Sequence, residues 1–155
     1  MAIEIEHKYL IDLEKFKACV PERSTHMRQG YILNESENTL RVRVMGTEAF
    51  MTVKGKSTGA SRLEFEYSIP VDDAEIILST FTKNTIEKIR HYVTYDGHLW
   101  EVDEFLGDNA GLYVAEIELG SEDEQYSLPS WVKDNVTADK RYSNSNLALH
   151  PFSTF

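Results

Sequence analysis

The chain has 155 residues, with 16 lysines and arginines against 26 aspartates and glutamates, so its formal net charge is −10. This length favours a single domain, residues 1–155, with a hydrophobic core large enough to be stable without disulfides or zinc. The single Cys19 excludes an internal disulfide and a cysteine-based zinc site. The acidic balance argues against nucleic acid and membrane surfaces as partners. No apolar run is long enough to cross a bilayer, and charges occupy the stretch where a signal peptide is apolar. We therefore expect a cytoplasmic protein.

Strand patterns dominate the sequence, because the side chains of a strand point alternately to its two faces. Alternation of apolar and polar residues predicts strands over 2–10, 27–33, 39–45, 49–55, 62–70, 85–94, 98–105 and 112–120. The strand over 27–33 is the weakest of these, because Gly30 interrupts it. Turn-forming residues occupy 34–38, 55–60, 96–97 and 107–111, between the predicted strands.

Helical patterns are few and short. A helix is predicted over 12–19 with Asp12 as its N-cap, and another over 72–82 with Asp72 as its N-cap. Two shorter helices are predicted over 128–135 and 143–150. No repeat or linker indicates a second domain.

Seven of the predicted strands carry charged residues two positions apart on one face and apolar residues on the other. The cations on these faces are Lys8, Arg41, Arg43, Lys54, Arg62, Lys88 and Arg90. The carboxylates are Glu4, Glu6, Glu64, Glu66, Glu101, Asp103, Glu116 and Glu118. For any one strand, a solvated outer face explains this pattern. For all of them together it does not, because like charges two residues apart repel each other and a neutral surface would avoid them.

An inverted barrel explains the whole set better. In that fold a closed, mostly antiparallel sheet turns its charged faces into a wet lumen, and its apolar faces point outward, where helices cover them. The last predicted helix would either plug one end of the lumen or cover the wall. Cations in the lumen would bind a polyanion, and carboxylates would bind divalent metal ions that bridge to it.

These residues resemble the motifs of the CYTH superfamily, the triphosphate tunnel metalloenzymes. The matching segments are ExExK at Glu4–Lys8, RxR at Arg41/Arg43, TxK at Thr52/Lys54, ExE at Glu64/Glu66, KxR at Lys88/Arg90, ExD at Glu101/Asp103, ExE at Glu116/Glu118 and DKRYSN at Asp139–Asn144. The resemblance covers nearly the whole chain and is strongest to short bacterial proteins that hydrolyse inorganic tripolyphosphate. His7 stands where such proteins often have arginine, and strand parity predicts that it points outward.

The resemblance implies an α+β fold with a closed, mostly antiparallel eight-stranded barrel, and a role for most of the charged residues. It places Glu6, Lys8 and Glu116 in catalysis. It makes Lys8, Arg41, Arg43, Lys54, Lys88, Arg90 and Lys140 ligands of the substrate. It makes Glu4, Glu6, Glu116 and Glu118 ligands of Mg²⁺ or Mn²⁺. Further candidates are Arg62, Glu64, Glu66, Glu101 and Asp103, for which ion pairing within the lumen is an equally good explanation. Lys8 could act as an acid or base if neighbouring cations depress its pKa.

The expected activity is metal-dependent hydrolysis of the terminal phosphoanhydride of a small triphosphate, most simply inorganic tripolyphosphate. Three alternatives use the same lumen: an adenylate cyclase that releases pyrophosphate, a thiamine or nucleoside triphosphatase, and a polyphosphate-binding module without activity. Retention of both carboxylate pairs, Glu4/Glu6 and Glu116/Glu118, favours an enzyme. Tyr31 would either line or gate the mouth of the lumen or, more simply, serve in packing. The oligomeric state is open.

Overall fold

The computed structural model describes residues 2–155. Its strands are β1 (Ile3–Ile11), β2 (Arg23–Asn34), β3 (Asn38–Met45), β4 (Glu48–Gly55), β5 (Ser61–Ile69), β6 (Ile86–Tyr95), β7 (His98–Phe105), β8 (Tyr113–Glu118) and β9 (Val132–Asn135). Its helices are α1 (Leu13–Phe16), α2 (Val71–Phe81) and α3 (Asn144–Leu149), with 3₁₀ turns η1 (Gly107–Asn109), η2 (Lys140–Tyr142) and η3 (Phe152–Thr154).

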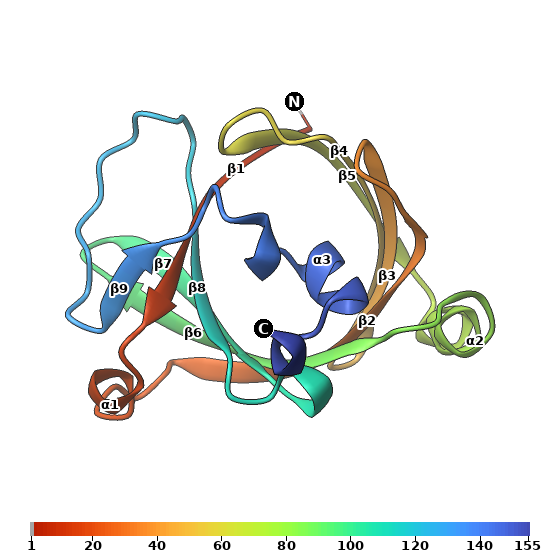
Figure 1. Ribbon diagram of the computed structural model, residues 1–155, viewed down its shortest axis with the longest axis horizontal. Coiled ribbons are helices and arrows are strands. Elements are labelled where there is room, and N and C mark those ends of the chain that lie inside the picture. Colours follow the sequence, from red (N-terminus) through yellow and green to blue (C-terminus); the bar gives the residue numbers. More distant parts are fainter. Residues whose placement is uncertain (1) are drawn as a thin grey trace.

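The first eight strands form a closed barrel, and every pairing within it is antiparallel. The strand order is β5-β4-β3-β2-β6-β7-β8-β1, and β1 also pairs with β5, which closes the ring (Figure 1). Strand β1 makes both contacts because its first half lies beside β5, with Glu4 opposite Arg62, and its second half beside β8, with Lys8 opposite Glu116. The predicted eight-stranded antiparallel barrel is therefore confirmed.

Several predicted elements differ from the observed ones at their ends. Strand β2 begins at Arg23 and runs through Gly30 without a break. Helix α1 ends at Phe16, although Asp12 caps it as predicted, by accepting a hydrogen bond from Lys15 N at 3.2 Å. Helix α2 has Pro70 at its N-cap and Asp72 inside its first turn, where the carboxylate favours the helix dipole.

The helix predicted over 128–135 is wrong. Residues 132–135 form β9, which pairs with the second half of β1 outside the barrel. Eight residues are too few for a helix to be stable without tertiary support. The free edge of β1 offers this segment backbone hydrogen bonds instead, because β1 leaves β5 after Ile5.

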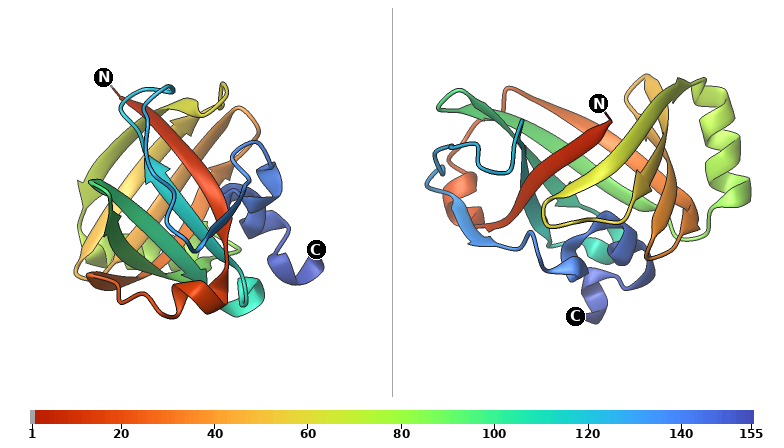
Figure 2. Two further views of the ribbon diagram at one scale, coloured as in Figure 1. Left: turned by 90° about the vertical axis from the view of Figure 1, so that its left-hand side faces the viewer. Right: turned by 90° about the horizontal axis from the view of Figure 1, so that it is seen from above.

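Apolar side chains on the outer faces of the strands form two of the three core clusters. On one side, Phe16 of α1 packs with Trp100, Trp131 and other residues of β1, β6, β7 and β8. On the other side, Ala74 and Leu78 of α2 pack onto β3 and β4. Figure 2 shows α1 and α2 at opposite ends of the molecule. His7 points outward as predicted, since its Nδ1 lies 2.6 Å from the Tyr126 hydroxyl.

The outer face of β5 departs from the expectation that helices cover the apolar sides. Leu63 is 53% exposed, Phe65 43% and Tyr67 61%. These side chains point outward because Arg62, Glu64 and Glu66 on the same strand line the lumen. Helix α2 follows β5 directly but packs over β2, β3 and β4 instead.

Helix α3 plugs one end of the barrel. Leu147 and Ala148 pack against Ile86, Phe105 and Val114, which form an apolar floor at the ends of β6, β7 and β8. In Figure 1 the C-terminal segment lies across the opening of the ring, and Figure 2 (right) places it on the side that faces the viewer of Figure 1. Within residues 2–155, none of the helices has the length and apolar character needed to cross a membrane.

Gly30 gives a test of how closely α2 approaches the barrel. A Cβ atom at Gly30 would lie 2.6 Å from Thr82 Oγ1 and 2.8 Å from Thr82 Cβ, at the end of α2. We predict that Gly30→Ala lowers the free energy of unfolding by about 1–3 kcal/mol, because overpacking forces Thr82 or the helix to move. Denaturant unfolding measures this change.

Gly55→Ala is the matched control, because its new Cβ would meet only Leu63 Cβ, at an ordinary 3.8 Å. Equal effects of the two substitutions would contradict the close packing of α2 on β2.

Candidate active site

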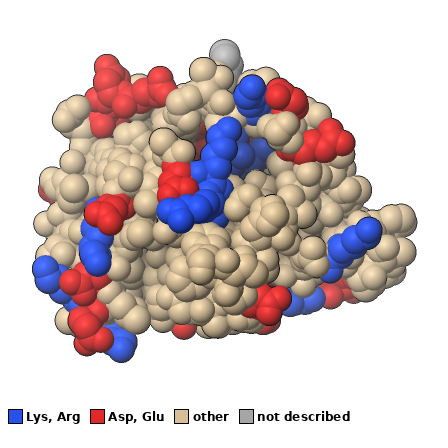
Figure 3. All heavy atoms as spheres, viewed as in Figure 1, with Lys and Arg blue, Asp and Glu red and all other residues tan. Residues whose placement is uncertain are grey.

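The inward faces of the strands surround a cavity of about 280 Å³. Its charged lining residues are Glu4, Glu6, Lys8, Arg41, Arg43, Lys54, Arg62, Glu64, Glu66, Arg90, Glu101, Glu116 and Glu118. Strand alternation places them there, since each lies two residues along its strand from another inward residue. Figure 3 shows lysine and arginine atoms near the centre of the face viewed in Figure 1, where the surface is hollowed.

The two signs of charge lie mostly on different sides of this cavity, with Lys8 of β1 and Arg62 of β5 as the exceptions. Strands β4, β3, β2 and β6 are consecutive in the sheet and carry Lys54, Arg41, Arg43 and Arg90, which we call the basic wall. Strands β7, β8, β1 and β5 complete the ring and carry the carboxylates Glu101, Glu116, Glu118, Glu4, Glu6, Glu64 and Glu66, which we call the acidic wall. Such a lumen can hold an anion on one side and a divalent cation on the other.

Two arginines of the basic wall are incompletely paired, although Lys54 and Arg90 each have carboxylate partners. Arg41 Nη2 lies 3.8 Å from Glu66 Oε2. Arg43 Nε donates to Gln29 Oε1 at 2.8 Å, which is a neutral acceptor. Burial and the nearby Arg41 and Arg90 together lower the pKa of Arg43 to about 9. Within residues 2–155, Arg41 Nε is buried and has no hydrogen-bond partner. An anion in the cavity would relieve both defects.

The acidic wall is partly neutralised by Lys54 of the basic wall and by Arg62 and Lys8 of its own strands. Glu4 accepts hydrogen bonds from Lys54 Nζ at 3.0 and 3.2 Å and from Arg62 Nε at 3.1 Å. Burial alone would raise the pKa of Glu4, but Lys54 and Arg62 hold it below its ordinary value. In the same way Lys8, whose Nζ lies 3.7 Å from Glu116, outweighs the effect of burial and holds the pKa of Glu116 low.

Among residues 2–155, Glu6 and Glu118 of this wall have no cation within ion-pair distance. Glu6 lies directly opposite Glu118 in the β1–β8 pairing. Burial, Glu116 and Glu4 together raise the pKa of Glu6 to about 8. Burial and the charge of Glu4 also raise the pKa of Glu118. This pair is therefore short of positive charge.

Lys8 is protonated, whereas a general base must be unprotonated. Burial would lower its pKa, but Glu116 and Glu6 raise it above the ordinary value. The expectation that neighbouring cations depress the pKa of Lys8 is wrong, because carboxylates of β1 and β8 surround it and Arg62 is the cation nearby.

The donor chemistry of the acidic wall fits a hard divalent cation. Within residues 2–155 no three carboxylate, histidine or cysteine side chains are grouped so as to hold a metal ion by themselves. Mg²⁺ is commonly held by one or two carboxylates together with waters and substrate phosphates. The under-neutralised Glu6 and Glu118, with Glu116 beside Glu6, match this mode of binding.

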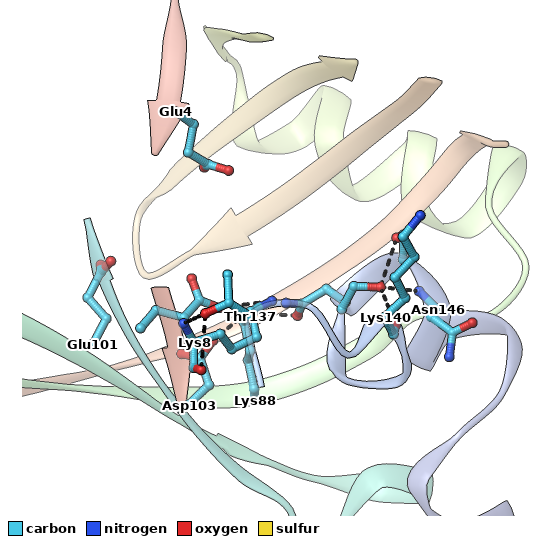
Figure 4. Close-up of polar contacts among 12 residues, drawn as sticks. Glu4, Lys8, Lys88, Glu101, Asp103, Thr137, Lys140 and Asn146 are labelled. Atoms are coloured by element: carbon cyan, nitrogen blue, oxygen red, sulfur yellow. Dashed lines mark hydrogen bonds and ion pairs between the residues drawn. The ribbon is translucent and has the colours of Figure 1, made fainter. Parts of the chain in front are cut away.

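Three of the predicted site residues do not line the cavity. Lys88 and Asp103 have no exposed surface, and Lys88 Nζ donates to Asp103 Oδ2 at 2.7 Å and to Asn144 Oδ1 at 3.0 Å. Burial lowers the pKa of Lys88 to about 7, because Asp103 is shared with Arg90 and offsets only part of the effect. Lys140 is exposed and lines a neighbouring cavity of about 320 Å³. Figure 4 shows Lys88 beside Asp103, and Lys140 farther away beside Asn146.

The sequence analysis missed several uncharged lining residues. Thr39 precedes Arg41 by two positions, so strand parity could have found it, whereas parity does predict Tyr92 on the face of Lys88 and Arg90. Tyr31 lines the cavity and also packs against the apolar floor, so packing is only part of its contribution. Ser143, Asn144 and Ser145 reach the cavity from the end of the DKRYSN segment and the start of α3, which no strand pattern indicates.

Comparison with known proteins agrees with this geometry. The model of the family described as "CYTH domain" matches residues 2–149. The chain belongs to the CYTH domain family. It is 45% identical over 156 residues to an inorganic triphosphatase of Acetivibrio thermocellus, an alignment that covers 100% of this chain and 99% of that protein.

Two further matches cover nearly the whole CYTH chain. An inorganic triphosphatase of Nitrosomonas europaea is 38% identical over 153 residues, which cover 94% of this chain and 97% of that protein. A crystal structure of an inorganic triphosphatase superposes with a TM-score of 0.66 at 36% identity, with 96% of each chain covered.

The raised pKa of Glu6 predicts how the metal-free CYTH chain responds to pH. Glu6 keeps its proton to about pH 8 when folded but loses it near its ordinary pKa of 4.5 when unfolded. The folded state then binds more protons between these values, so this contribution to stability is lost as the pH rises toward 8 and beyond. We predict that Glu6→Gln matches the wild type in melting temperature near pH 5 and exceeds it near pH 9.

Thermal unfolding with a chelator present measures both proteins. The exposed Glu37→Gln serves as a control and should follow the wild type at each pH. Parallel pH profiles for wild type and Glu6→Gln would contradict the isolation of Glu6.

Proposed function

We propose that this chain is a metal-dependent inorganic triphosphatase, which hydrolyses the terminal phosphoanhydride of inorganic tripolyphosphate and releases orthophosphate. The observation that carries the proposal is one cavity of about 280 Å³ lined by both signs of charge, in which Arg41 and Arg43 on one wall and Glu6 and Glu118 on the other are incompletely paired. Full-length relatives at 45% and 38% identity that are named inorganic triphosphatase support the same activity. A cytoplasmic location belongs to the proposal, since a free cysteine suits a reducing compartment.

The basic wall would bind the phosphate chain. Arg41, Arg43 and Arg90 present planar forks of donors that match phosphate oxygens in pairs, and Lys54 supplies a point charge. In phosphoryl transfer the developing charge lies on the non-bridging oxygens of the transferred group, so positioned cations lower the barrier directly. Lys88 lies behind this wall and would support it through its charge and its hydrogen bonds. Lys140 would contribute its charge at the neighbouring cavity.

The acidic wall would hold the metal ion and order the water. Glu6, Glu116 and Glu118 are the ligands we propose, with Glu4 nearby, and Mg²⁺ or Mn²⁺ is the ion that suits oxygen donors. When bound, the ion supplies charge neutralisation and Lewis acidity to the phosphates. Lys8, which keeps its proton, would donate to a phosphate oxygen from the same wall. Glu64, Glu66 and Glu101, which line the cavity, would accept hydrogen bonds from the attacking water.

The products of a triphosphate panel test the assignment. We predict that the wild type releases orthophosphate from tripolyphosphate when Mg²⁺ or Mn²⁺ is supplied. Glu6→Gln and Lys54→Ala should each lower kcat/KM by about 100-fold or more, because each removes a charge that the transition state needs. Arg28→Ala is the control, since Arg28 pairs with Glu75 of α2 and does not line the cavity.

Other outcomes identify the alternatives. Cyclic AMP and pyrophosphate from ATP would establish a cyclase, and orthophosphate from a nucleoside or thiamine triphosphate alone would change the substrate. Tight binding of tripolyphosphate without turnover in any metal would establish a binding module.

A further inference from the structure

A continuous set of hydrogen bonds behind the cavity connects two arginines of the basic wall through two neutral amides. Its members, which we call the amide network, are Arg43, Gln29, Asn144, Lys88, Asp103 and Arg90. Gln29 Oε1 accepts from Arg43 Nε at 2.8 Å, and Gln29 Nε2 donates to Asn144 Oδ1 at 3.2 Å. Asn144 Oδ1 also accepts from Lys88 Nζ at 3.0 Å. Asp103 then joins Lys88 to Arg90, whose Nε and Nη2 donate to it at 2.8 and 2.9 Å.

Gln29 and Asn144 occupy positions at which a carboxylate would neutralise the cations that are expected to bind phosphate. Strand β2 lies between β3 and β6, in the middle of the basic wall, and its inward residue Gln29 has no exposed surface. A glutamate at this position could accept the same hydrogen bond from Arg43, but it would form an ion pair with the guanidinium and compete with phosphate for it. The amide fixes the direction of the Arg43 side chain and leaves its charge available.

Asn144 makes the network depend on the plug helix. It is the first residue of α3, which Ser143 caps, and Leu147 of that helix is buried in the apolar floor. Asn34 Nδ2 of β2 donates to Ser145 O at 2.9 Å and fixes the same turn to the barrel. The packing of α3 on the apolar floor therefore positions Asn144 Oδ1, which accepts hydrogen bonds from Lys88 and Gln29.

We infer that Gln29 and Asn144 are positioning residues: Gln29 orients Arg43 toward a bound triphosphate without neutralising its charge, and Asn144 holds Gln29 and the buried Lys88 in place behind the cavity. The inference rests on the proposed function for its substrate. It assigns a role to Gln29, which carries no charge and lies outside the charged motifs, and to Asn144, which ends the DKRYSN segment.

The isosteric substitution Gln29→Glu separates positioning from mere packing. A carboxylate can still accept from Arg43 but loses the hydrogen bond that Gln29 Nε2 donates to Asn144 Oδ1, so a purely structural role predicts an unchanged or lower melting temperature with unchanged KM. Positioning without neutralisation predicts that the melting temperature is kept, that KM for tripolyphosphate rises by about tenfold or more, and that its metal-free binding weakens equally in calorimetry. Gln125→Glu, at an exposed position, adds the same charge elsewhere and should change neither.

Asn144→Asp keeps the proposal testable if Gln29→Glu fails to fold, because Asn144 is only half-buried. It should raise KM in the same way, while Asn144→Leu, which removes the acceptor, should lower kcat. Wild-type KM and binding in both charge variants would overturn the inference. Calorimetry with tripolyphosphate alone keeps this result separate from the proposed function, which fails if the wild type does not turn over.

A second, independent inference concerns the uncovered outer face of β5. Ile3 of β1 lies opposite Leu63, and Val53 of β4 lies opposite Phe65, so these residues and Tyr67 form one continuous patch, which we call the β5 patch. Ile3 is 44% and Val53 41% exposed. Figure 2 (right) looks onto β1 and β5 from this side, with α2 standing beside them.

The size and charge of the β5 patch indicate its occupant. Its five side chains are each 41% to 61% exposed and adjoin one another, and contiguous apolar patches of this kind often mark interaction sites. A stable interface buries about 800 Å² per partner, so a polar rim would complete the one formed here. None of its five side chains is charged, although the chain has a net charge of −10. Asp72 and Asp73 follow β5 directly, which disfavours an anionic membrane as the occupant.

We propose that the β5 patch binds the same patch of a second copy of this chain, in a two-fold dimer. Sedimentation of the full chain should show a dimer at micromolar concentration, strengthened by salt because salt screens the repulsion between two acidic chains. Phe65→Glu should give a monomer with wild-type triphosphatase activity, since residue 65 points away from the lumen. Tyr67→Lys repeats the test if Phe65→Glu is unstable. Ile76→Glu is the control, because Ile76 is 61% exposed on α2.

A wild type that is monomeric at about 100 μM would overturn the dimer, whether or not it binds anionic vesicles. A dimer that survives both Phe65→Glu and Tyr67→Lys would overturn the assignment to this patch.

Discussion

Closure of the barrel through β1 is the constraint on which the site depends. Because one strand pairs with β5 along its first half and with β8 along its second, its inward residues Glu4, Glu6 and Lys8 lie where the two halves of the sheet meet. The alternation of side chains then fixes which face of each remaining strand points inward. The inward charged residues of one strand therefore lie beside those of its neighbours. The apolar side chains are forced outward, where α1 and α2 cover most of them and the β5 patch stays open.

The charged side chains of the lumen can be buried because most of them have a hydrogen-bond or ion-pair partner. Ion pairs such as Glu4 with Lys54 hold part of it, and the neutral acceptor Gln29 holds Arg43 without cancelling its charge. What remains is an Arg43 without a carboxylate partner on one wall and an under-neutralised Glu6 on the other. These incompletely paired charges lower the stability of the empty barrel. A phosphate chain bound together with a divalent ion would neutralise them.

Strand parity explains why so much could be predicted from the sequence, and also where prediction failed. Parity fixes the face to which a side chain points but not its depth along the lumen. On β6 the inward series Arg90, Lys88, Ile86 runs from the cavity wall through a buried ion pair to the apolar floor. Lys88 is thus on the predicted face but beneath the cavity. Strand β9 and the amide of Asn144 depend on tertiary contacts with β1 and β6, which local patterns do not contain.

A crystal structure of the chain grown with tripolyphosphate and Ca²⁺, as a slow substitute for Mg²⁺, tests the central claim most directly. The account predicts phosphate oxygens within hydrogen-bond distance of Arg41, Arg43 and Arg90, and the cation between the phosphates and Glu6. Tripolyphosphate bound only outside the barrel, with the two walls still facing water, would contradict it.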